Sequence, residues 1–350
     1  MKTLQREHTV KTFQSSLMDQ YFGGMRMGVF DIETMGIVAE KSPMILAGLL
    51  TPLDEERVRI TQYFAEKPGD EAAIIGALRR HFQEIDYLVT YNGRQFDVPY
   101  LRKRAKLLGL APFRYNLSNL DLYMLIKGYS EVSFFLKNIK QKTVEAYMGF
   151  ADDRRDTISG VESIFLYESF QQCQDAELRD ILANRILLHN HDDLLQLYRL
   201  LPIIRQLDFH KGINMLGFPV LGENGWPYLS VTRARAVGRE FEISGQYNGP
   251  EFSYVSYDTF LHYYSCEFYD DGDFVFKIPV ERHKGNSFIR LSLYFDDFSD
   301  LKRYPGFANG FMLVSRGLEP CHMDSSMFAQ KFLRDFMQKN ICPLAAMYPL

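Results

Sequence analysis

Apolar runs that end in turns or acids dominate the first hundred residues. MRMGVFDIE, at residues 25–33, predicts a buried strand. PMILAGLLT and RVRITQYFAE predict two more strands, and the short links between these segments favour antiparallel neighbours. We then expect a helix from about Asp70 to Gln83, a strand in DYLVTYN and a basic helix opened by Pro99-Tyr100-Leu101.

From Asn119 to about Arg199 the pattern is mostly helical. The stretch from Asp175 to Leu200 is long and strongly periodic, because apolar residues recur there at helical spacing. Antiparallel strands, then alternating helices and strands, then a helical segment predict an α/β layer fold.

The composition changes near Leu207, where glycine and proline become frequent, and this stretch is the best candidate for a domain boundary. Beyond it, segments rich in aromatic and β-branched residues predict strands. A closing helix is expected at residues 324–340, with Asp324 or Ser325 as its N-cap. We therefore expect a lead-in at residues 1–24 with a polar helix-like stretch, an α/β domain at residues 25–206, and a smaller β-rich (α+β) domain of unknown function at residues 207–350.

The composition of the 350 residues is that of a globular protein, with 46% hydrophobic and 24% charged residues. The net charge is −4, from 40 basic and 44 acidic residues, so no broad basic surface is expected. This charge balance argues against a protein that coats nucleic acid more strongly than against a metal-dependent nuclease. In a nuclease, bound cations reverse the local field of an acidic site.

Four cysteines are scattered without CxxC spacing, which leaves a zinc site or a disulfide framework unsupported. The first ten residues are charged and lack an apolar core, so we expect no signal peptide. The longest apolar run, around Met44 to Leu50, is too short to span a bilayer. We expect a reduced, cytoplasmic protein without a membrane partner.

An acidic pair ends the first predicted strand of the α/β domain. Side chains alternate along a strand, so Asp31 and Glu33 point to one face. Two neighbouring carboxylates repel each other and are costly to desolvate, and a divalent metal ion would compensate. The alternative is a solvated strand end.

Two further acidic positions follow. Asp97 comes after YNGRQF, where a strand ends and a helix begins, and it either joins a site at the carboxyl end of the sheet or merely caps the helix. His189 and Asp193 are four residues apart and share one helical face, which either meets the domain or forms an exposed polar patch. We expect His191 and Asp192 at the surface.

Taken together and in this order, FDIET, YNGRQFDVPYL and HNHDDLLQL resemble the three exonuclease motifs of the DEDD superfamily, and the YprB-like group of predicted exonucleases in particular. LDLYM and a helix at Lys142–Gly149 lie between the second and third motifs. The resemblance covers roughly Met25 to Leu200. It implies a ribonuclease H-like fold, with a mixed five-stranded sheet flanked by helices. It also implies a set of four metal-binding acids: Asp31, Glu33, Asp97 and Asp193.

The sequence departs from the family pattern at His189. The superfamily usually carries a Tyr four residues before the last Asp, or a His five before it. On a helix, four residues return to within about 40° of the starting side chain, whereas five residues lie about 140° away. His189 therefore takes the Tyr position with His chemistry, and we expect it to be catalytic. The alternatives are a partner of a nearby acid or a degenerate site.

The resemblance implies catalysis with two Mg²⁺ or Mn²⁺ ions, roughly 3.5–4 Å apart. Asp31, Glu33 and Asp193 would hold the ion that activates water. Asp31, with Asp97 bound directly or through water, would hold the ion at the leaving 3′ oxygen. An unperturbed His titrates near pH ~6.5, so His189 would orient or deprotonate the water near neutrality. The products would be 5′ mononucleotides.

The expected substrate is a single-stranded 3′ end of DNA or RNA. The helix Arg102–Lys106 and the segment Lys137–Lys142 either contact phosphates or are solvated surface. Phe96 either packs beside a terminal base or joins the core. The expected nucleic-acid contacts are Thr34, Asn92, Phe96, Arg102 and Lys140. A C-terminal aromatic stripe is either a stacking platform or the core of a small sheet; it comprises Tyr254, Tyr257, Phe260, Tyr263, Tyr264, Phe268, Phe274 and Phe276.

The sequence thus predicts a metal-dependent 3′–5′ exonuclease. One alternative is a catalytically weak nucleic-acid-binding or adaptor protein that retains the fold. Another is a structure-specific endonuclease of the same fold, against which the NGxxFD pattern argues.

Overall fold

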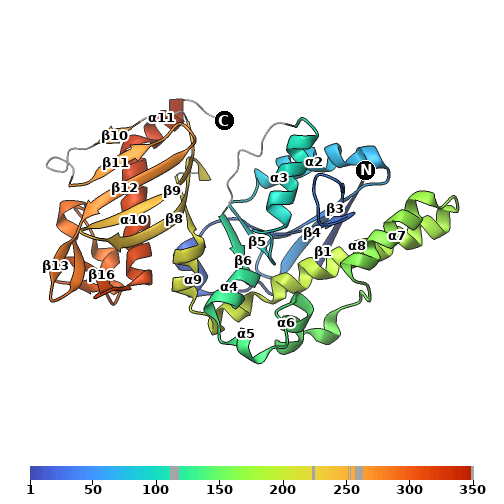
Figure 1. Ribbon diagram of the computed structural model, residues 1–350, viewed down its shortest axis with the longest axis horizontal. Coiled ribbons are helices and arrows are strands. Elements are labelled where there is room, and N and C mark those ends of the chain that lie inside the picture. Colours follow the sequence, from blue (N-terminus) through green and yellow to red (C-terminus); the bar gives the residue numbers. More distant parts are fainter. Residues whose placement is uncertain (111–117, 223–224, 251, 253, 257–262, 348–350) are drawn as a thin grey trace. The chain divides into compact units, whose positions relative to one another are not determined.

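The computed structural model describes residues 1–110, 118–222, 225–250, 252, 254–256 and 263–347 (Figure 1). Within them the chain forms two compact units. The first unit contains Met1–Met18, Gly24–Tyr115 and Asn119–Asp208. The second unit contains Asp19–Gly23, Asn116–Ser118 and Phe209–Leu350. Among the described residues, no helix has the length and apolar character needed to span a membrane.

A six-stranded mixed sheet with the order β1-β4-β3-β2-β5-β6 forms the centre of the first unit (Figure 1). Its strands are β1 (Lys2–Thr9), β2 (Met27–Thr34), β3 (Met44–Pro52), β4 (Arg57–Phe64), β5 (Tyr87–Thr90) and β6 (Ser118–Asp121). The pairs β1–β4, β4–β3 and β3–β2 are antiparallel, whereas β2 and β5 run parallel. The first seven residues of β3 are all buried, because this central strand is covered on both faces.

Helices surround this sheet. They are α2 (Glu71–Phe82), α3 (Asp97–Leu107), α4 (Leu122–Tyr129), α5 (Val132–Phe135), α6 (Gln141–Tyr147), α7 (Gly160–Gln172) and α8 (Ala176–Arg199), with short 3₁₀ turns at Pro68–Asp70, Ala151–Asp153 and Leu201–Gln206. Helix α1 (Ser16–Phe22) is divided between the units, because Asp19–Gly23 belongs to the second unit. Ser159 and Glu162 form a capping box that begins α7, and Asp175 caps α8. The long α8 packs against β2, β3 and β4, and α7 lies along it.

The predicted α/β class is confirmed, but the sheet has six strands rather than five. The additional strand is β1, in the segment expected to be a lead-in, and it pairs with β4 from Lys2↔Phe64 to Thr9↔Arg57. Its residues are half-buried or exposed, and polar residues occupy both faces. An edge strand of this kind lacks the alternation of apolar and polar residues that identifies a strand from sequence.

The second unit is rich in strands, as expected. One sheet has the order β10-β11-β12-β9-β8-β7 and another has the order β13-β14-β16-β15, with β17 paired to β16. The strands are β7 (Phe218–Leu221), β8 (Tyr228–Val237), β9 (Glu240–Asn248), β10 (Val255–Ser256), β11 (Ser265–Phe268), β12 (Asp273–Pro279), β13 (Glu281–His283), β14 (Asn286–Arg290), β15 (Phe307–Ala308), β16 (Phe311–Arg316) and β17 (Glu319–Pro320). The helices are α9 (Phe209–Leu216), α10 (His322–Asn340) and α11 (Cys342–Met347), with 3₁₀ turns at Leu291–Leu293 and Ser299–Arg303.

The aromatic stripe contributes to the core of the second unit. Phe268 and Phe276 are buried, and their rings lie 5.9 Å and 4.8 Å from the ring of Phe336 on α10. This packing favours the core interpretation over a stacking platform. Two members of the stripe, Tyr257 and Phe260, lie outside the described residues.

The N-cap expected for the closing helix is wrong. Helix α10 begins at His322 with Cys321 as its N-cap, so the two expected capping residues lie inside the first turns. Asp324 is buried, and one of its carboxylate oxygens accepts the backbone N–H of Gly306 at 2.8 Å. It therefore fixes a loop of the second unit onto the helix rather than capping it.

Candidate metal centre

Two acids lie on the central strand β2. Asp31 pairs in register with Gly48 of β3, and Glu33 with Leu46. Because side chains alternate along a strand, both carboxylates point to the same face of the sheet. The Glu33 side chain is buried, so the interpretation of a freely solvated strand end is wrong for this residue.

Asp97 is the first residue of α3, and its side chain does not cap the helix. One carboxylate oxygen instead accepts the backbone N–H of Ile32, on β2 between the two strand acids, at 3.1 Å. Burial raises the pKa of Asp97 to about 7, even though hydrogen bonds from backbone N–H groups act in the opposite direction. The third acid is therefore fixed beside the first two.

Helix α8 contributes His189 and Asp193, one turn apart. The Nε2 atom of His189 lies 3.7 Å from Oε1 of Glu33 and 3.6 Å from Oδ2 of Asp193. Ligand atoms of these three residues all lie within 4.8 Å of one another, and no other such group of His, Cys, Asp and Glu is found in the described part of the chain. The geometry is compact enough for a metal ion to bind.

The electrostatics of the cluster extend to Asp31. Burial raises the pKa of Asp31 well above its ordinary value, and the charges of Asp97, Asp193 and Glu33 raise it further. Burial and the charges of Asp193 and Asp97 likewise raise the pKa of Glu33. Carboxyl groups that repel one another in a buried site retain their protons unless a cation neutralises them. The oxygen-rich donor set therefore fits a hard divalent cation.

A chain of hydrogen bonds orients Asp31. Gln62 on β4 donates from Nε2 to Oδ1 of Asn190 at 2.8 Å, and Asn190 donates from Nδ2 to Oδ2 of Asp31 at 2.8 Å. Gly48 makes room for this contact, because a Cβ atom there would lie 2.2 Å from Oδ1 of Asn190 and 2.5 Å from Cδ1 of Leu194. Sequence reasoning missed all three supporting residues, although Asn190 lies within the HNHDD motif.

His189 is held by a carboxylate that the sequence did not reveal. Its Nδ1 atom lies 2.7 Å from Oδ2 of Asp156, which also contacts Nζ of Lys142 at 3.0 Å. Burial alone would raise the pKa of Asp156, but hydrogen bonds from His189, Arg154 and Lys142 hold it below its usual range. Because a carboxylate only accepts, the Nδ1 of His189 donates, and Nε2 faces Glu33 and Asp193.

The carboxylates around His189 increase its affinity for a proton. Burial alone would lower the pKa of His189, but the hydrogen bond to Asp156 and the charges of Asp193, Asp156 and Asp31 raise it above its ordinary value. A proton accepted at Nε2 is therefore stabilised by the surrounding carboxylates.

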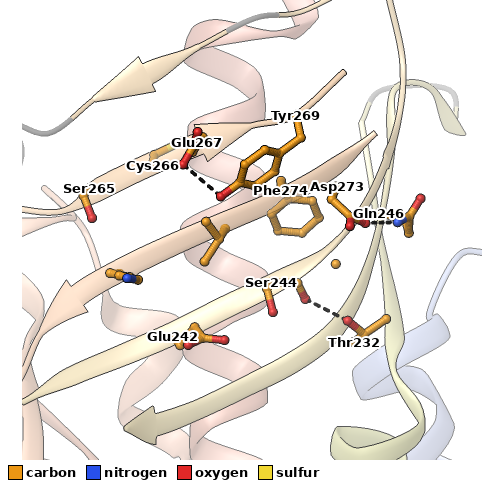
Figure 2. A pocket seen from close by; sticks show the side chains of 13 residues that line it. Thr232, Glu242, Ser244, Gln246, Ser265, Cys266, Glu267, Tyr269, Asp273 and Phe274 are labelled. Carbon is orange, nitrogen blue, oxygen red and sulfur yellow. Dashed lines mark hydrogen bonds between the residues drawn. The ribbon is translucent and has the colours of Figure 1, made fainter. Parts of the chain in front are cut away.

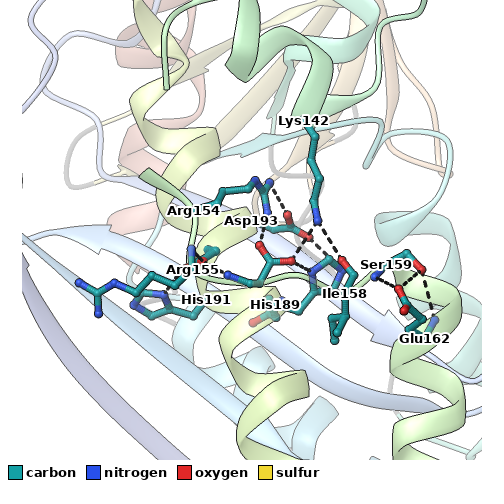
Figure 3. Close-up of polar contacts among 12 residues, drawn as sticks. Lys142, Arg154, Arg155, Ile158, Ser159, Glu162, His189, His191 and Asp193 are labelled. Atoms are coloured by element: carbon teal, nitrogen blue, oxygen red, sulfur yellow. Dashed lines mark hydrogen bonds and ion pairs between the residues drawn. The ribbon is translucent and has the colours of Figure 1, made fainter. Parts of the chain in front are cut away.

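Arg154 lies against the acid cluster (Figure 3). Its Nη2 atom is 2.6 Å from Oδ1 of Asp193 and 2.6 Å from Oε1 of Glu145, and its Nη1 atom is 2.8 Å from Oδ1 of Asp156. The guanidinium side chain is only 7% exposed. It occupies one oxygen of Asp193, while the other oxygen faces His189. Arg154 therefore competes with any cation for the first of these oxygens.

The expectation that His191 and Asp192 lie at the surface is wrong, because both are buried. One oxygen of Asp192 accepts the backbone N–H groups of Arg155 at 2.6 Å and Asp156 at 2.8 Å. The Nε2 atoms of His191 and of His8, on β1, lie 2.9 Å apart. The second face of α8 is thus covered by the segment that carries Asp156 and by the edge strand that the sequence did not predict.

A buried acid fixes the turn before Asp97. Asp121 is fully buried, and its carboxylate accepts the backbone N–H groups of Asn92 at 2.9 Å and Arg94 at 3.0 Å. Asn92 has φ 67°, in the left-handed region that Asn tolerates better than most residues. LDLYM was noted in the sequence, but the role of its Asp was not.

The residues expected to contact nucleic acid lie outside the acid cluster. Thr34 donates its hydroxyl to the carbonyl oxygen of Gly36 at 2.9 Å. Phe96 is half-buried, with its ring 5.3 Å from that of Tyr100, whereas Arg102 and Lys140 are exposed. The structure leaves their contact with nucleic acid a prediction.

Two basic side chains named as candidates for phosphate contacts pair within the protein instead. Arg104 on α3 forms a salt bridge with the buried Glu71, at 2.5 Å between Nη2 and Oε2. Lys142 is held by Asp156 and by the carbonyl oxygen of Ile158, at 2.9 Å. These two cations stabilise the fold, and exposed lysines and arginines remain for a ligand.

The second unit has a hollow of about 480 Å³ over the face formed by β8, β9, β11 and β12 (Figure 2). Its lining includes the acids Glu242, Glu267 and Asp273 and the base Lys277. Tyr269 donates its hydroxyl to Glu267 at 2.8 Å, and Asp273 accepts from Gln246. Because acids outnumber bases, this hollow disfavours the phosphate backbone of nucleic acid.

Comparison with known proteins places the acid cluster in a family context. The model of the RNase H superfamily matches residues 29–204, which include the four predicted acids. The uncharacterized protein YprB of Bacillus subtilis (strain 168) is 27% identical over 178 residues, which are 49% of this chain and 40% of YprB. The resemblance to YprB-like proteins is thereby confirmed.

DNA polymerases also match this chain. The DNA polymerase of Desulfurococcus sp. (strain Tok) is 33% identical over 97 residues, which are 25% of this chain and 12% of the polymerase. The solved structure of the family B DNA polymerase from the hyperthermophilic archaeon Pyrobaculum calidifontis aligns at 24% identity and a TM-score of 0.41, over 54% of this chain and 26% of that chain. The chain thus spans less than half the length of each of these relatives.

Proposed function

This chain belongs to the RNase H superfamily, a nuclease superfamily, and we propose that it is a metal-dependent 3′–5′ exonuclease that releases 5′ mononucleotides from a single-stranded end. One observation carries the proposal. Acids from β2, α3 and α8 act on one another electrostatically, and burial and this mutual repulsion raise the pKa of Asp31 and Glu33. Ligand atoms of Glu33 and Asp193 lie close to His189. A site built in this way has an excess of negative charge that divalent cations relieve.

Asp31, Glu33, Asp97 and Asp193 would hold two Mg²⁺ or Mn²⁺ ions. Such ions, when bound, activate water and stabilise charge on the phosphate and the leaving oxygen. His189 would receive the proton of the attacking water at Nε2, because its Nδ1 is engaged by Asp156. Asn190 would keep Asp31 in place through its hydrogen bond.

One observation favours the alternative of a catalytically weak nucleic-acid-binding protein. Arg154 already supplies a positive charge to Asp193, at 2.6 Å. If this ion pair persists when nucleic acid binds, Asp193 has only one free oxygen for a metal ion. Activity measured with Mg²⁺ and with Mn²⁺ separates the two functions.

The decisive experiment is a nuclease assay with end-labelled DNA and RNA oligonucleotides in Mg²⁺ or Mn²⁺. A 3′–5′ exonuclease shortens 5′-labelled strands progressively and releases the label from 3′-labelled strands as mononucleotides. Asp31→Ala and Asp193→Ala are each expected to lower the rate by about a thousandfold or more, because the ions stabilise the transition state by several kcal/mol.

The matched control is Asp180→Ala. Asp180 lies on the same helix as Asp193, but its side chain is 73% exposed, and we expect this variant to retain the wild-type rate. Circular dichroism melting checks that each variant is folded. Digestion by Asp193→Ala at the wild-type rate would falsify the assignment of the acids.

A further inference from the structure

Two adjacent phenylalanines on α5 lie in solvent. The side chain of Phe134 is 84% exposed and that of Phe135 is 78% exposed, more than any other phenylalanine in the described part of the chain. Single exposed apolar residues are common, but here two neighbouring rings on a four-residue helix are both open to solvent. Such rings are suited to stacking against flat ligands.

Positive charge flanks this aromatic pair. Lys137 and Lys140 follow it and are exposed, and Lys127 on α4 is exposed with its Nζ 5.5 Å from the ring centroid of Tyr123. The nearest acid in the sequence is Glu131, just before α5. Residues 127–140 thus carry three exposed lysines and one exposed acid, although the whole chain carries a net charge of −4.

Residues 138–141, just after the aromatic pair, form one wall of a groove of about 410 Å³. This volume is in the size range of small-ligand pockets, roughly 300–1,000 Å³. The rings of Tyr91 and Tyr123 meet edge to face in its lining, 5.9 Å apart, and Lys140 borders them. Asn92 also lines the groove, and its Oδ1 is buried without a hydrogen-bond partner in the described structure. An unpartnered buried acceptor is costly, and a ligand with an N–H or O–H group would satisfy it.

A hydrogen bond links the lining of the groove to the helix that carries Asp193. Gln141, at the edge of the groove, donates from Nε2 to the backbone carbonyl oxygen of Asp193 at 2.9 Å. In the other direction, Lys140 is five positions after Phe135, which is at most roughly 17 Å of extended chain. The groove and the aromatic pair are thus neighbours along the chain, and together we call them the path.

We propose that this path binds the single strand behind the terminal nucleotide: a base enters the groove beside Tyr91 and Tyr123, and a base further along stacks on Phe134 and Phe135. The inference rests on the proposed function, because the acid cluster defines where the strand ends. Lysines contact the phosphates, and aromatic faces accept any base. Duplex ends would be poor ligands, because paired bases cannot reach the rings.

The test uses the full chain with Phe134→Ala and Phe135→Ala combined, and Phe165→Ala as the control. Phe165 is also exposed, at 62%, but lies on α7. Fluorescence anisotropy in EDTA measures the binding of labelled oligothymidine and oligouridine of about 15 nucleotides without hydrolysis. Stacking predicts that the double variant binds the long strand roughly five- to a hundredfold more weakly. Restoring aromatic rings with Phe134→Trp and Phe135→Trp is expected to restore the affinity.

Chain length provides a second measurement. The double variant is expected to bind a labelled trinucleotide as the wild type does, because so short a strand ends within the groove. Unchanged affinity for the long strand in the double variant overturns the inference. So does a result in which the double variant loses only binding to phosphatidylserine vesicles, because the surface would then be a membrane contact.

The inference and the proposed function fail in different ways. If the wild type binds the long strand more tightly than the double variant but releases no mononucleotides, the inference about the path is supported and the exonuclease assignment is wrong. If the wild type digests the strand and the double variant is equally fast on long and short strands, the exonuclease stands and the path is lost.

Discussion

At the scale of single residues, burial has opposite outcomes for the carboxyl groups of this site. Asp31, Glu33 and Asp97 face one another, and their pKa values are raised. Asp156 is buried too, but its pKa is lowered, because His189, Arg154 and Lys142 surround it. Asp31, Glu33 and Asp97 lack a counter-charge, which an added cation would supply. The charge of Asp156 is already neutralised by side chains of the protein. This difference separates candidate metal ligands from a positioning residue.

The raised pKa values predict how the metal-free protein responds to pH. A carboxyl group with a raised folded-state pKa binds its proton more tightly when folded, so its stabilising contribution is complete at low pH and is lost as pH rises through the folded-state pKa. The window therefore runs from about pH 4, the unfolded value, to about 7 for Asp97. In EDTA, we expect the free energy of unfolding to fall by a few kcal/mol across it, on the order given by the pKa shift.

Chemical denaturation in EDTA at a series of pH values measures this loss. Asp97→Asn carries no charge and is expected to flatten the decline, and saturating Mn²⁺ is expected to reverse it near neutral pH. The lowered pKa of Asp156 acts in a separate window below about pH 4, where its stabilising contribution is lost as the carboxylate takes up a proton. A wild-type stability that declines between pH 4 and 7 no more than that of Asp97→Asn would contradict the electrostatic description.

His189→Ala distinguishes a base from a metal ligand. The Nε2 atom lies near both Glu33 and Asp193, so the geometry alone permits either role. If His189 acts as a base, its removal lowers kcat by about 10²–10⁴-fold and leaves the Mn²⁺ dissociation constant nearly unchanged. Calorimetry measures the metal affinity, and initial rates at saturating Mn²⁺ measure kcat. A loss of metal affinity that accounts for the whole loss of rate would make His189 a ligand.

The residues of the site could be predicted from the sequence only where their spacing placed them on the same face of a strand or helix. The i, i+2 pair Asp31 and Glu33 and the i, i+4 pair His189 and Asp193 are periodic, so each pair shares a face whatever the tertiary structure. Asp156 lies 33 residues before its partner His189, and Arg154 lies 39 residues before Asp193. Both belong to a segment without regular periodicity, and only tertiary folding brings them to the site.

At the scale of elements, the site depends on how closely α8 approaches the sheet. Gly48 on β3 is the point of closest approach, because its missing side chain leaves room for Asn190 and Leu194. Gly48→Ala is expected to push α8 outward and to weaken the hydrogen bond from Asn190 to Asp31. Overpacking of this kind costs about 1–3 kcal/mol, and a small displacement of catalytic groups lowers the rate by about 10²-fold.

The matched control is Gly76→Ala, on helix α2. A Cβ atom at this position meets only Nη1 of Arg80, at 4.0 Å, so this variant is expected to be more stable by roughly 0.5–1 kcal/mol and fully active. Thermal unfolding and initial rates compare the two variants. If Gly48→Ala were as active as Gly76→Ala, the close approach of helix and sheet would not position Asp31.

The elements themselves were predictable to the extent that each had a buried face. β2, β3 and β4 were recognised because their apolar runs are buried in the centre of the sheet. β1 was missed because it lies at the edge with polar residues on both faces. The same omission led to the wrong expectation for His191, since the strand that covers it through His8 was not predicted.

At the scale of the whole chain, the two units do not divide at a single point in the sequence. A composition change predicts a boundary at residues 206/207, and this linear division stays a proposal. The second unit also includes Asp19–Gly23, from the N-terminal region. Tyr21 is fully buried there, with its hydroxyl 2.9 Å from Nδ1 of His210 and its ring 5.9 Å from that of Phe209. An aromatic residue in a short polar helix gives no sign in the sequence of which unit buries it.

Because segments of the two units alternate along the chain, we predict that a fragment of residues 1–208 aggregates, although it contains the whole acid cluster. Removing Phe209 and His210 exposes Tyr21 and Phe22, and exposed aromatic surface promotes association. We expect the fragment to aggregate on size-exclusion chromatography, and the double substitution Tyr21→Ser and Phe22→Ser to return it to a monomer. Because both aromatics belong to the second unit, the corrected fragment is expected to retain the nuclease rate of the full chain on a trinucleotide. A monomeric, stable fragment without these substitutions would show that residues 19–23 are not an integral part of the second unit.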